Sequence, residues 1–277
     1  MIPIGWFVWW GFFVDPAVGK KKEKRYGREL MMNSQKNQKS QSVQFSTRAE
    51  DYDRLQPIRI EMFEFYHSLA MDFIPFDDQT EFRMLDLGCG TGIFLNCVLM
   101  KYPKATCVAI DFSDEMMKFA AQKVGTFSDR VAFFQRDLNE GLLEGLGSFQ
   151  FVASFSTIHH LTDENKVRIF RQIYDVLETG GWFFFIDAMS TRFDDDVYRL
   201  GRRRLTLRRE ERFEEAGIDI EEANRVREII EQVDEDSPER DRISRFSSQV
   251  EWLKEAGFRS VDYIWHLWME HFIICRK

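Results

Sequence analysis

The stretch MLDLGCGTGIF, residues 84–94, constrains the fold more than any other part of the chain. An apolar run that carries one acid, Asp86, leads directly into Gly88, Gly90 and Gly92. Glycines between a strand and a helix let a ligand approach the backbone, and the first N–H groups of a helix have no partner within it. The stretch therefore predicts a strand–turn–helix unit that binds a ligand.

The spacing of these glycines narrows the class of ligand. Dinucleotide-binding loops use G-x-G-x-x-G, in which the third glycine packs the helix on the strand. Here the register is G-x-G-x-G, and Ile93 stands where that last glycine would be. Asp86 would also lie badly beside a pyrophosphate but well beside a cation. The loop therefore indicates a nucleoside-like ligand without phosphates.

The chain from residue 45 onward alternates strand-like and helix-like segments. The expected strands are residues 82–87, 106–111, 130–137, 149–155 and 182–188. The expected helices are 59–74, 92–102, 113–124 with Ser113 as N-cap, and 163–181, with Val167 and Leu177 on its apolar face and Gly180 as its stop. This alternation predicts a parallel sheet with helices on both faces, which binds ligands beyond the carboxyl ends of its strands.

Several ordered motifs resemble those of class I S-adenosylmethionine-dependent methyltransferases. LDLGCGTG resembles their first signature, and it is followed in register by AIDFS, FFQRDL, VASFSTIHHL, VLETGGWFFFID and WLKEAGFRSVDYIW…HFIICRK. The resemblance covers residues 48–277. It implies an α/β, Rossmann-like fold whose seven-stranded, mostly parallel sheet has helices on both faces, an antiparallel last strand and a helical insertion after the fifth strand. It also implies methyl transfer from S-adenosyl-L-methionine to an acceptor, and the resemblance is to members of the family that act on small molecules.

The resemblance also implies roles for individual residues toward the cofactor. Asp111, 25 residues after Asp86, would hold the ribose hydroxyls, and Asp137 would accept from the adenine amino group, with Leu138 beside it. Alternatively, Asp137 caps the turn DLNEG. We read Cys89 as a small buried loop residue rather than a nucleophile. The cofactor-binding residues expected in full are Asp86, Gly88, Cys89, Gly90, Gly92, Asp111, Phe112, Met116, Asp137, Leu138 and Phe155, with Tyr52 and Arg59 as a lid.

Three ionisable residues follow the fourth and fifth expected strands, where the acceptor should lie. His159, His160 and Asp187 are therefore the candidates for a general base. The alternative is that at least one histidine only packs the next helix and that Asp187 caps a turn. Tyr52 and Arg59 likewise have the alternative of packing at the entry to the first helix.

The net charge and the positions of the cysteines argue against nucleic-acid binding and against a metal site. The formal net charge of −8 argues against broad nucleic-acid binding, which needs a basic surface. The four cysteines form no C-x-x-C pair, and no His or Cys cluster has the sequence spacing of zinc ligands, so we predict no metal. Reduced thiols fit an intracellular, cytoplasmic enzyme.

Residues 1–47 form an apolar run followed by a polar segment. The first 14 residues are apolar, and basic residues follow them rather than precede them, unlike a signal peptide. The run is also shorter than the roughly 20 residues that span a bilayer. We expect that the run is not part of the working protein, with an interfacial membrane anchor as the alternative, and that 33–45 is a disordered linker.

An insertion at about 190–246 follows the fifth expected strand. It carries seven arginines among residues 199–212 and an acidic stretch after them. We expect basic and acidic helical faces to pair. The placement also predicts a helical cap over the acceptor. The layout is similar to carboxy-S-adenosylmethionine synthase, a tRNA-modification enzyme, which stays an alternative together with a non-catalytic S-adenosylmethionine-binding protein.

Overall fold

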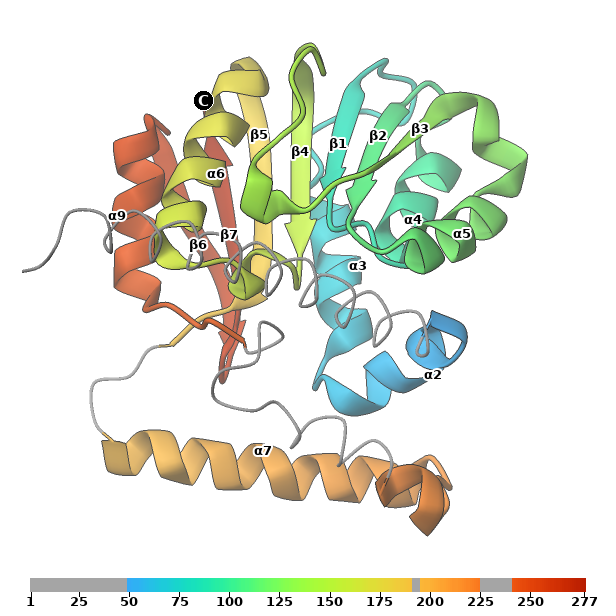
Figure 1. Ribbon diagram of the computed structural model, residues 1–277, viewed down its shortest axis with the longest axis vertical. Helices are drawn as coiled ribbons and strands as arrows, with labels where there is room; N and C mark the ends of the chain where they lie inside the picture. The colour runs from blue at the N-terminus through green and yellow to red at the C-terminus, as the bar shows by residue number, and fades with distance from the viewer. Residues whose placement is uncertain (1–48, 191–194, 225–240) are drawn as a thin grey trace, which may run out of the picture. The chain divides into compact units, whose positions relative to one another are not determined.

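The computed structural model describes residues 49–190, 195–224 and 241–277 (Figure 1). The predictions for the apolar run and the linker fall on residues 1–48 and lie outside the described residues. Within the described ranges, no helix combines the length and apolar character needed to cross a membrane.

One seven-stranded sheet runs through the chain from residue 83 to residue 276, in the order β3-β2-β1-β4-β5-β7-β6 (Figure 1). Its strands are β1 (Arg83–Leu87), β2 (Thr106–Asp111), β3 (Val131–Gln135), β4 (Phe149–Phe155), β5 (Leu177–Ala188), β6 (Ser260–Leu267) and β7 (Glu270–Arg276). The first five strands pair in parallel, and β7 is antiparallel to both of its neighbours. The expected mostly parallel sheet with an antiparallel last strand is confirmed.

The helices cover both faces of this sheet. They are α2 (Ala49–Arg59), α3 (Phe63–Phe73), α4 (Ile93–Lys101), α5 (Asp114–Lys123), α6 (Asp163–Val176), α7 (Asp195–Glu215) and α9 (Phe246–Ala256), with short 3-10 turns η1 (Gly125–Arg130), η2 (Leu138–Glu140) and η3 (Ile158–His160). The α5 helix begins as expected, because the Ser113 hydroxyl accepts from the backbone N–H of Met116.

Alternation along the strands divides the core into two clusters. Leu85 and Leu87 of β1 pack with residues of α6 and α9, whereas Met84 packs with residues of α3, α4 and α5 on the opposite face. Because side chains alternate along a strand, Asp86 points to the same face as Met84. This places a carboxylate among the apolar side chains of α3 and α4.

Two expected element boundaries are wrong. The helix expected at 59–74 begins only at Phe63, because Met62 adopts a left-handed backbone conformation (φ 64°), and the residues expected to precede it form a separate helix, α2. The helix expected at 163–181 ends at Val176. Leu177 belongs to β5 and pairs with Phe149.

The C-terminal residues explain the early end of α6. Gly180 lies inside β5, and its backbone N–H donates to the carbonyl of Lys277 at 3.0 Å, so it joins the sheet instead of ending a helix. Pairing within the sheet therefore determines the conformation of these residues, although their local sequence favours a helix. Val167, expected on the apolar face, is 39% exposed, and Ile169 takes its place in the core.

The described part of the insertion contains α7, and the two ends of the insertion meet. Ser190 forms a parallel bridge with Arg245, and its N–H donates to Ser244 O at 3.0 Å. In α7, Arg208 and Arg212 lie 3.3 and 3.6 Å from Glu61, in the turn between α2 and α3. These two arginines are therefore used in structural ion pairs, and residues 191–194 and 225–240 lie outside the described residues.

Candidate cofactor site and related proteins

The three glycines after β1 all have positive φ angles, of 72°, 53° and 76°, but different surroundings. A Cβ atom at Gly88 would lie 2.0 Å from the Thr157 hydroxyl oxygen, and one at Gly92 would lie 3.0 Å from the Ala120 Cβ atom. A Cβ atom at Gly90 would meet nothing within 4 Å. Gly88 and Gly92 are thus required by packing, whereas Gly90 faces open space that a ligand can occupy.

Asp111 ties this loop to the end of β2. One carboxylate oxygen accepts from the N–H of Gly90 and the other from the N–H of Ser113, both at 2.9 Å. Burial raises the pKa of Asp111, and these backbone N–H groups oppose the rise. A carboxylate has about four lone-pair positions, so acceptor capacity remains for a ribose hydroxyl. That contact stays a prediction.

Asp86 is a buried carboxylate that faces the pocket. Its residue is 4% exposed, and none of the hydrogen bonds among the described residues involves its side chain. Burial, with a smaller contribution from the charge of Asp111, raises the pKa of Asp86 to about 7. A carboxylate held without a partner in an apolar wall is stabilised by a nearby cation.

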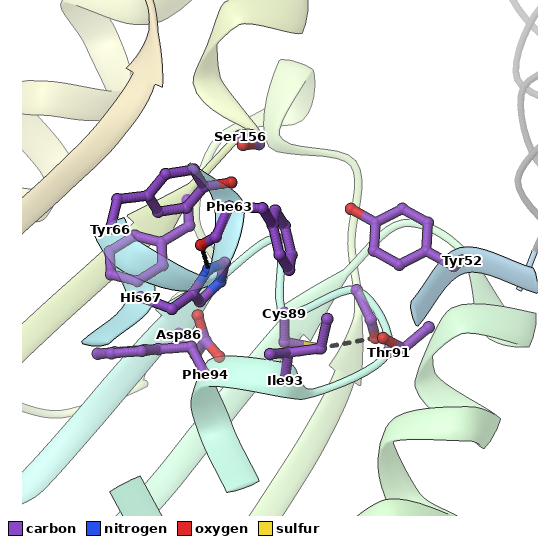
Figure 2. Close-up of a pocket in the computed structure, with 13 residues that line it drawn as sticks. Tyr52, Phe63, Tyr66, His67, Asp86, Cys89, Thr91, Ile93, Phe94 and Ser156 are labelled. Carbon is purple, nitrogen blue, oxygen red and sulfur yellow. Dashed lines mark hydrogen bonds between the residues drawn. The ribbon is translucent and has the colours of Figure 1, made fainter. Parts of the chain in front are cut away.

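A hollow of about 410 Å³, which includes space open to solvent, extends from this carboxylate. Figure 2 shows side chains from α2, α3, the loop after β1, the start of α4 and the end of β4 around it. The lining residues are Tyr52, Phe63, Tyr66, His67, Asp86, Gly88, Cys89, Gly90, Thr91, Ile93, Phe94, Phe155 and Ser156.

The lining divides the residues expected at the cofactor site into two groups. Tyr52, Asp86, Gly88, Cys89, Gly90 and Phe155 line the hollow, whereas Arg59, Gly92, Asp111, Phe112, Met116, Asp137 and Leu138 do not. Burial raises the pKa of the Cys89 thiol well above its usual value, which fits the expected inert loop residue. For both groups, contact with a cofactor stays a prediction.

Several of the residues that do not line the hollow contact other parts of the protein. The Asp137 carboxylate accepts from the N–H of Asn139 at 2.8 Å and caps η2, as the alternative interpretation expected. Leu138 is buried next to it, and Met116 is buried in α5. The carbonyl of Phe112 accepts from the Gln135 side chain at 2.9 Å.

Sequence reasoning missed the contribution of α3 to the hollow. His67 stacks on Tyr66 with ring centroids 4.7 Å apart, and its Nδ1 donates to Phe63 O at 2.8 Å. Burial lowers the pKa of His67 to about 4, so it is neutral. The Tyr66 hydroxyl has no hydrogen-bond partner among the described residues and points toward Ser156 (Figure 2). In the sequence, the only indication that α3 lines the hollow was the polar pair Tyr66 and His67 within an otherwise apolar helix.

The three candidate bases lie together beyond β4 and β5. The Nδ1 atom of His159 hydrogen-bonds Asp187, and the backbone N–H of His159 donates to the other carboxylate oxygen at 3.0 Å. Burial opposes a charge on His159, but Asp187 and Asp241 outweigh it and raise the pKa of His159 to about 10. A histidine protonated at neutral pH does not accept a proton. A catalytic role for His159 therefore stays a prediction that requires the loss of this proton.

The pKa of His160 is shifted in the opposite direction from that of His159. Its ring centroid lies 4.0 Å from that of His159. Burial, and then the charge of His159, lowers the pKa of His160 to about 3, so its ring is neutral. The Asp187 carboxylate also accepts from the N–H of Ala188 at 2.9 Å. The turn that Asp187 would cap in the alternative interpretation, at 190–192, extends outside the described residues.

Comparisons with known proteins agree with this geometry. Residues 84–181 match the family model described as a methyltransferase domain. The malonyl-[acyl-carrier protein] O-methyltransferase 1 of Ilyobacter polytropus is 24% identical over 66% of this chain and 63% of its own length. The carboxy-S-adenosyl-L-methionine synthase of Nautilia profundicola is 26% identical over 66% of this chain and 71% of its own. The chain thus spans less than two thirds of the first of these relatives.

A solved structure supports the fold independently. The DhpI–SAH complex aligns with 87% of this chain and 96% of its own, with a TM-score of 0.56 and 16% identity. The matched domain begins in β1 and contains the glycine loop and Asp111. The chain therefore contains a methyltransferase domain, at residues 84–181, within a fold of the class I S-adenosylmethionine-dependent type.

Proposed function

We propose that the protein transfers a methyl group from S-adenosylmethionine to a small-molecule acceptor. The observation that carries this proposal is the pairing of open space at Gly90 with the unpartnered carboxylate of Asp86. The methionine part of the cofactor has a cationic ammonium and no phosphate, which suits this wall of the hollow. The cofactor supplies an electrophilic methyl group when bound.

In this proposal the residues of the chain position the reactants. Asp111 fixes the loop and offers its remaining lone pairs to the ribose, and Tyr52 closes the hollow from α2. Arg59, at the end of α2, interacts electrostatically with Tyr52 and is proposed to complete the lid. Alignment of donor and acceptor with exclusion of water is the main demand of such a reaction.

The acceptor is proposed to lie beyond β4 and β5. Ser156 lines the hollow, and the η3 turn that carries His159 and His160 follows within a few residues. The ring of His160 is neutral, but its pKa of about 3 makes it a weak proton acceptor, so the proposed transfer relies mainly on the alignment of donor and acceptor. The insertion that contains α7 is proposed to cover this region.

The relatives suggest two finer alternatives for the reaction. The name of the malonyl-[acyl-carrier protein] O-methyltransferases indicates an acceptor with a carboxyl group. Small carboxylic acids are therefore the first acceptors to screen. Carboxy-S-adenosylmethionine synthase is favoured by its alignment over 71% of its own length. A cytoplasmic location stays a prediction with both.

The test is a cofactor and turnover assay on the full chain. Calorimetry should show binding of S-adenosylmethionine and S-adenosylhomocysteine and no binding of NAD. Labelled S-adenosylmethionine should then give labelled product with a member of a panel of small acids, amines and phenols. Mass spectrometry of the copurified cofactor identifies the carboxylated form if the synthase alternative holds. Tight NAD binding, or no binding of S-adenosylmethionine, contradicts the proposal.

A further inference from the structure

Three side chains with metal-binding atoms converge beyond the ends of β4 and β5. His159 Nε2 and His160 Nδ1 lie 3.5 and 3.8 Å from the same oxygen of Asp241, and all three atoms lie within 4.8 Å of one another. The histidines belong to η3, and Asp241 follows the insertion, about 80 residues later. The sequence spacing therefore hid this cluster, and the fold assembles it.

The hydrogen bond to Asp187 orients His159 within the cluster. Because the Nδ1–H group of His159 bonds Asp187, its Nε2 atom is the one directed at Asp241. Without a metal, a proton on Nε2 joins His159 to the Asp241 oxygen at 3.5 Å and leaves His160 outside the contact. A metal ion in place of that proton joins all three atoms.

We propose that His159, His160 and Asp241 bind one divalent transition-metal ion, with zinc or manganese as the expected classes. Two imidazoles and one carboxylate suit such ions. Bonds of about 2.0–2.1 Å place tetrahedral ligand atoms about 3.3 Å apart. The histidine nitrogens lie 3.5 and 3.8 Å from the Asp241 oxygen, and all three atoms lie within 4.8 Å of one another, so metal binding requires the side chains to rotate toward a common centre.

Asp187 has the position of a supporting carboxylate for this site. A histidine that binds a metal commonly donates its other ring N–H to a carboxylate, which fixes the ring. Asp187 is fully buried and is itself held by the backbone N–H groups of His159 and Ala188. Glu270 is close enough to interact electrostatically with Asp187, His159 and Asp241, so a bound cation stabilises its charged form.

The segment that carries Asp241 is anchored rather than loosely placed. The N–H of Arg242 donates to the carbonyl of His159 at 2.7 Å. The buried Lys166 of α6 bonds the carbonyl of Arg242 and, at 2.5 Å, the hydroxyl of Ser244. The cluster is thus preorganised by contacts on both sides of Asp241, which lowers the cost of binding an ion.

The site keeps access to solvent. The side chains of His159, His160 and Asp241 are 11%, 29% and 57% exposed. Three protein ligands leave at least one coordination position for another molecule, as in catalytic metal sites. In a reading that rests on the proposed function, an oxygen of the acceptor occupies this position, and the metal lowers its pKa before methyl transfer.

The test measures metal binding without cofactor or acceptor, so its failure is distinct from failure of the methyltransferase proposal. Purified protein is stripped with a chelator and titrated with Co²⁺ by absorption spectroscopy and with Zn²⁺ by calorimetry. The expected result is one equivalent bound, with cobalt ligand-field bands. H160A and D241N should each lose this binding, and D187N should weaken it about 10–100-fold.

The matched control is H266A, because His266 is an exposed histidine on β6 outside the cluster. It should bind Co²⁺ like the unaltered protein. S-adenosylmethionine binding, measured in each variant, shows that the variant is folded. If the unaltered protein binds Co²⁺ no better than the D241N variant, the metal proposal is wrong and a proton-bridged histidine between two aspartates is the correct description.

Discussion

Gly88 and Gly145 share a left-handed backbone conformation but not their surroundings. Their φ angles are 72° and 75°. A Cβ atom at Gly88 would lie 2.0 Å from Thr157, whereas one at Gly145 would meet nothing within 4 Å. The pair therefore separates the cost of backbone strain from the cost of a steric clash.

We predict that G145A destabilises the protein by about 1 kcal/mol, the cost of a left-handed alanine. G88A should cost at least about 2 kcal/mol, because overpacking adds roughly 1–3 kcal/mol. Urea unfolding of both variants gives the comparison. Equal losses of unfolding free energy in the two variants would show that the loop shifts away from Thr157 freely.

The charge of Asp86 gives cofactor binding a pH dependence. The pKa of this buried carboxyl is about 7, and a protonated carboxyl does not attract an ammonium. Affinity for S-adenosylmethionine should therefore rise as pH increases from 5.5 to 7.5, by up to about tenfold per pH unit below the pKa. D86N should bind weakly with a flat profile over this range. A flat profile in the unaltered protein would place the ammonium elsewhere.

Asp111 should contribute to affinity through charged hydrogen bonds. D111A is expected to weaken S-adenosylmethionine binding by about 1.5–3 kcal/mol, as measured by calorimetry. The matched control is D114A, because Asp114 is an exposed acid in the first turn of α5, paired with Lys118. If both variants keep full affinity, the ribose does not bind at the end of β2.

At the scale of elements, Glu270, the first residue of β7, has a buried carboxyl group whose charged form is destabilised. Glu270 pairs with Ala188 in β5, and its Oε2 atom is buried without a hydrogen-bond partner among the described residues. Burial, and then the charge of Asp187, raises the pKa of Glu270 to about 7 from its ordinary value of 4.5. The folded protein therefore binds this proton more tightly than the unfolded chain does.

The sign of the resulting pH effect follows from linkage. The stability that Glu270 contributes is fully present below pH 4.5 and is lost as pH rises through about 7. The melting temperature of E270Q should therefore fall less between pH 5 and pH 8 than that of the unaltered protein. The difference corresponds to roughly 1–3 kcal/mol. Parallel melting curves of the two proteins across this range would rule out a buried charged Glu270.

The elements also show what the sequence determines and what it leaves open. The strand ending at Leu87 and the glycine turn after it are local, because apolar alternation and glycine spacing depend on neighbouring residues. The end of α6 is not local, since Gly180 is drawn into β5 by the carbonyl of Lys277. The position of α3 beside the hollow and the approach of Asp241 to His159 depend on contacts between distant segments. The periodic spacing of apolar residues does not predict such contacts.

At the scale of the whole molecule, the sheet and both core clusters lie between Phe63 and Arg276. We predict that deleting residues 1–31 changes neither the melting temperature nor the affinity for S-adenosylmethionine. Differential scanning calorimetry and ligand titration of the shortened chain check this. A loss of several degrees would show that the deleted segment contributes to the domain.

The junction of Ser190 with Ser244 and Arg245 has a consequence for how this chain can change. Because the two ends of the insertion are adjacent, the intervening residues can be exchanged for a longer or shorter cassette with only a small loop-closure cost. Such an exchange keeps the glycine loop and Asp111 while it replaces Asp241 and α7, and it removes the ion pairs of Arg208 and Arg212 with Glu61. If the insertion covers the acceptor as proposed, a new cassette changes what is methylated while the glycine loop still holds the methyl donor.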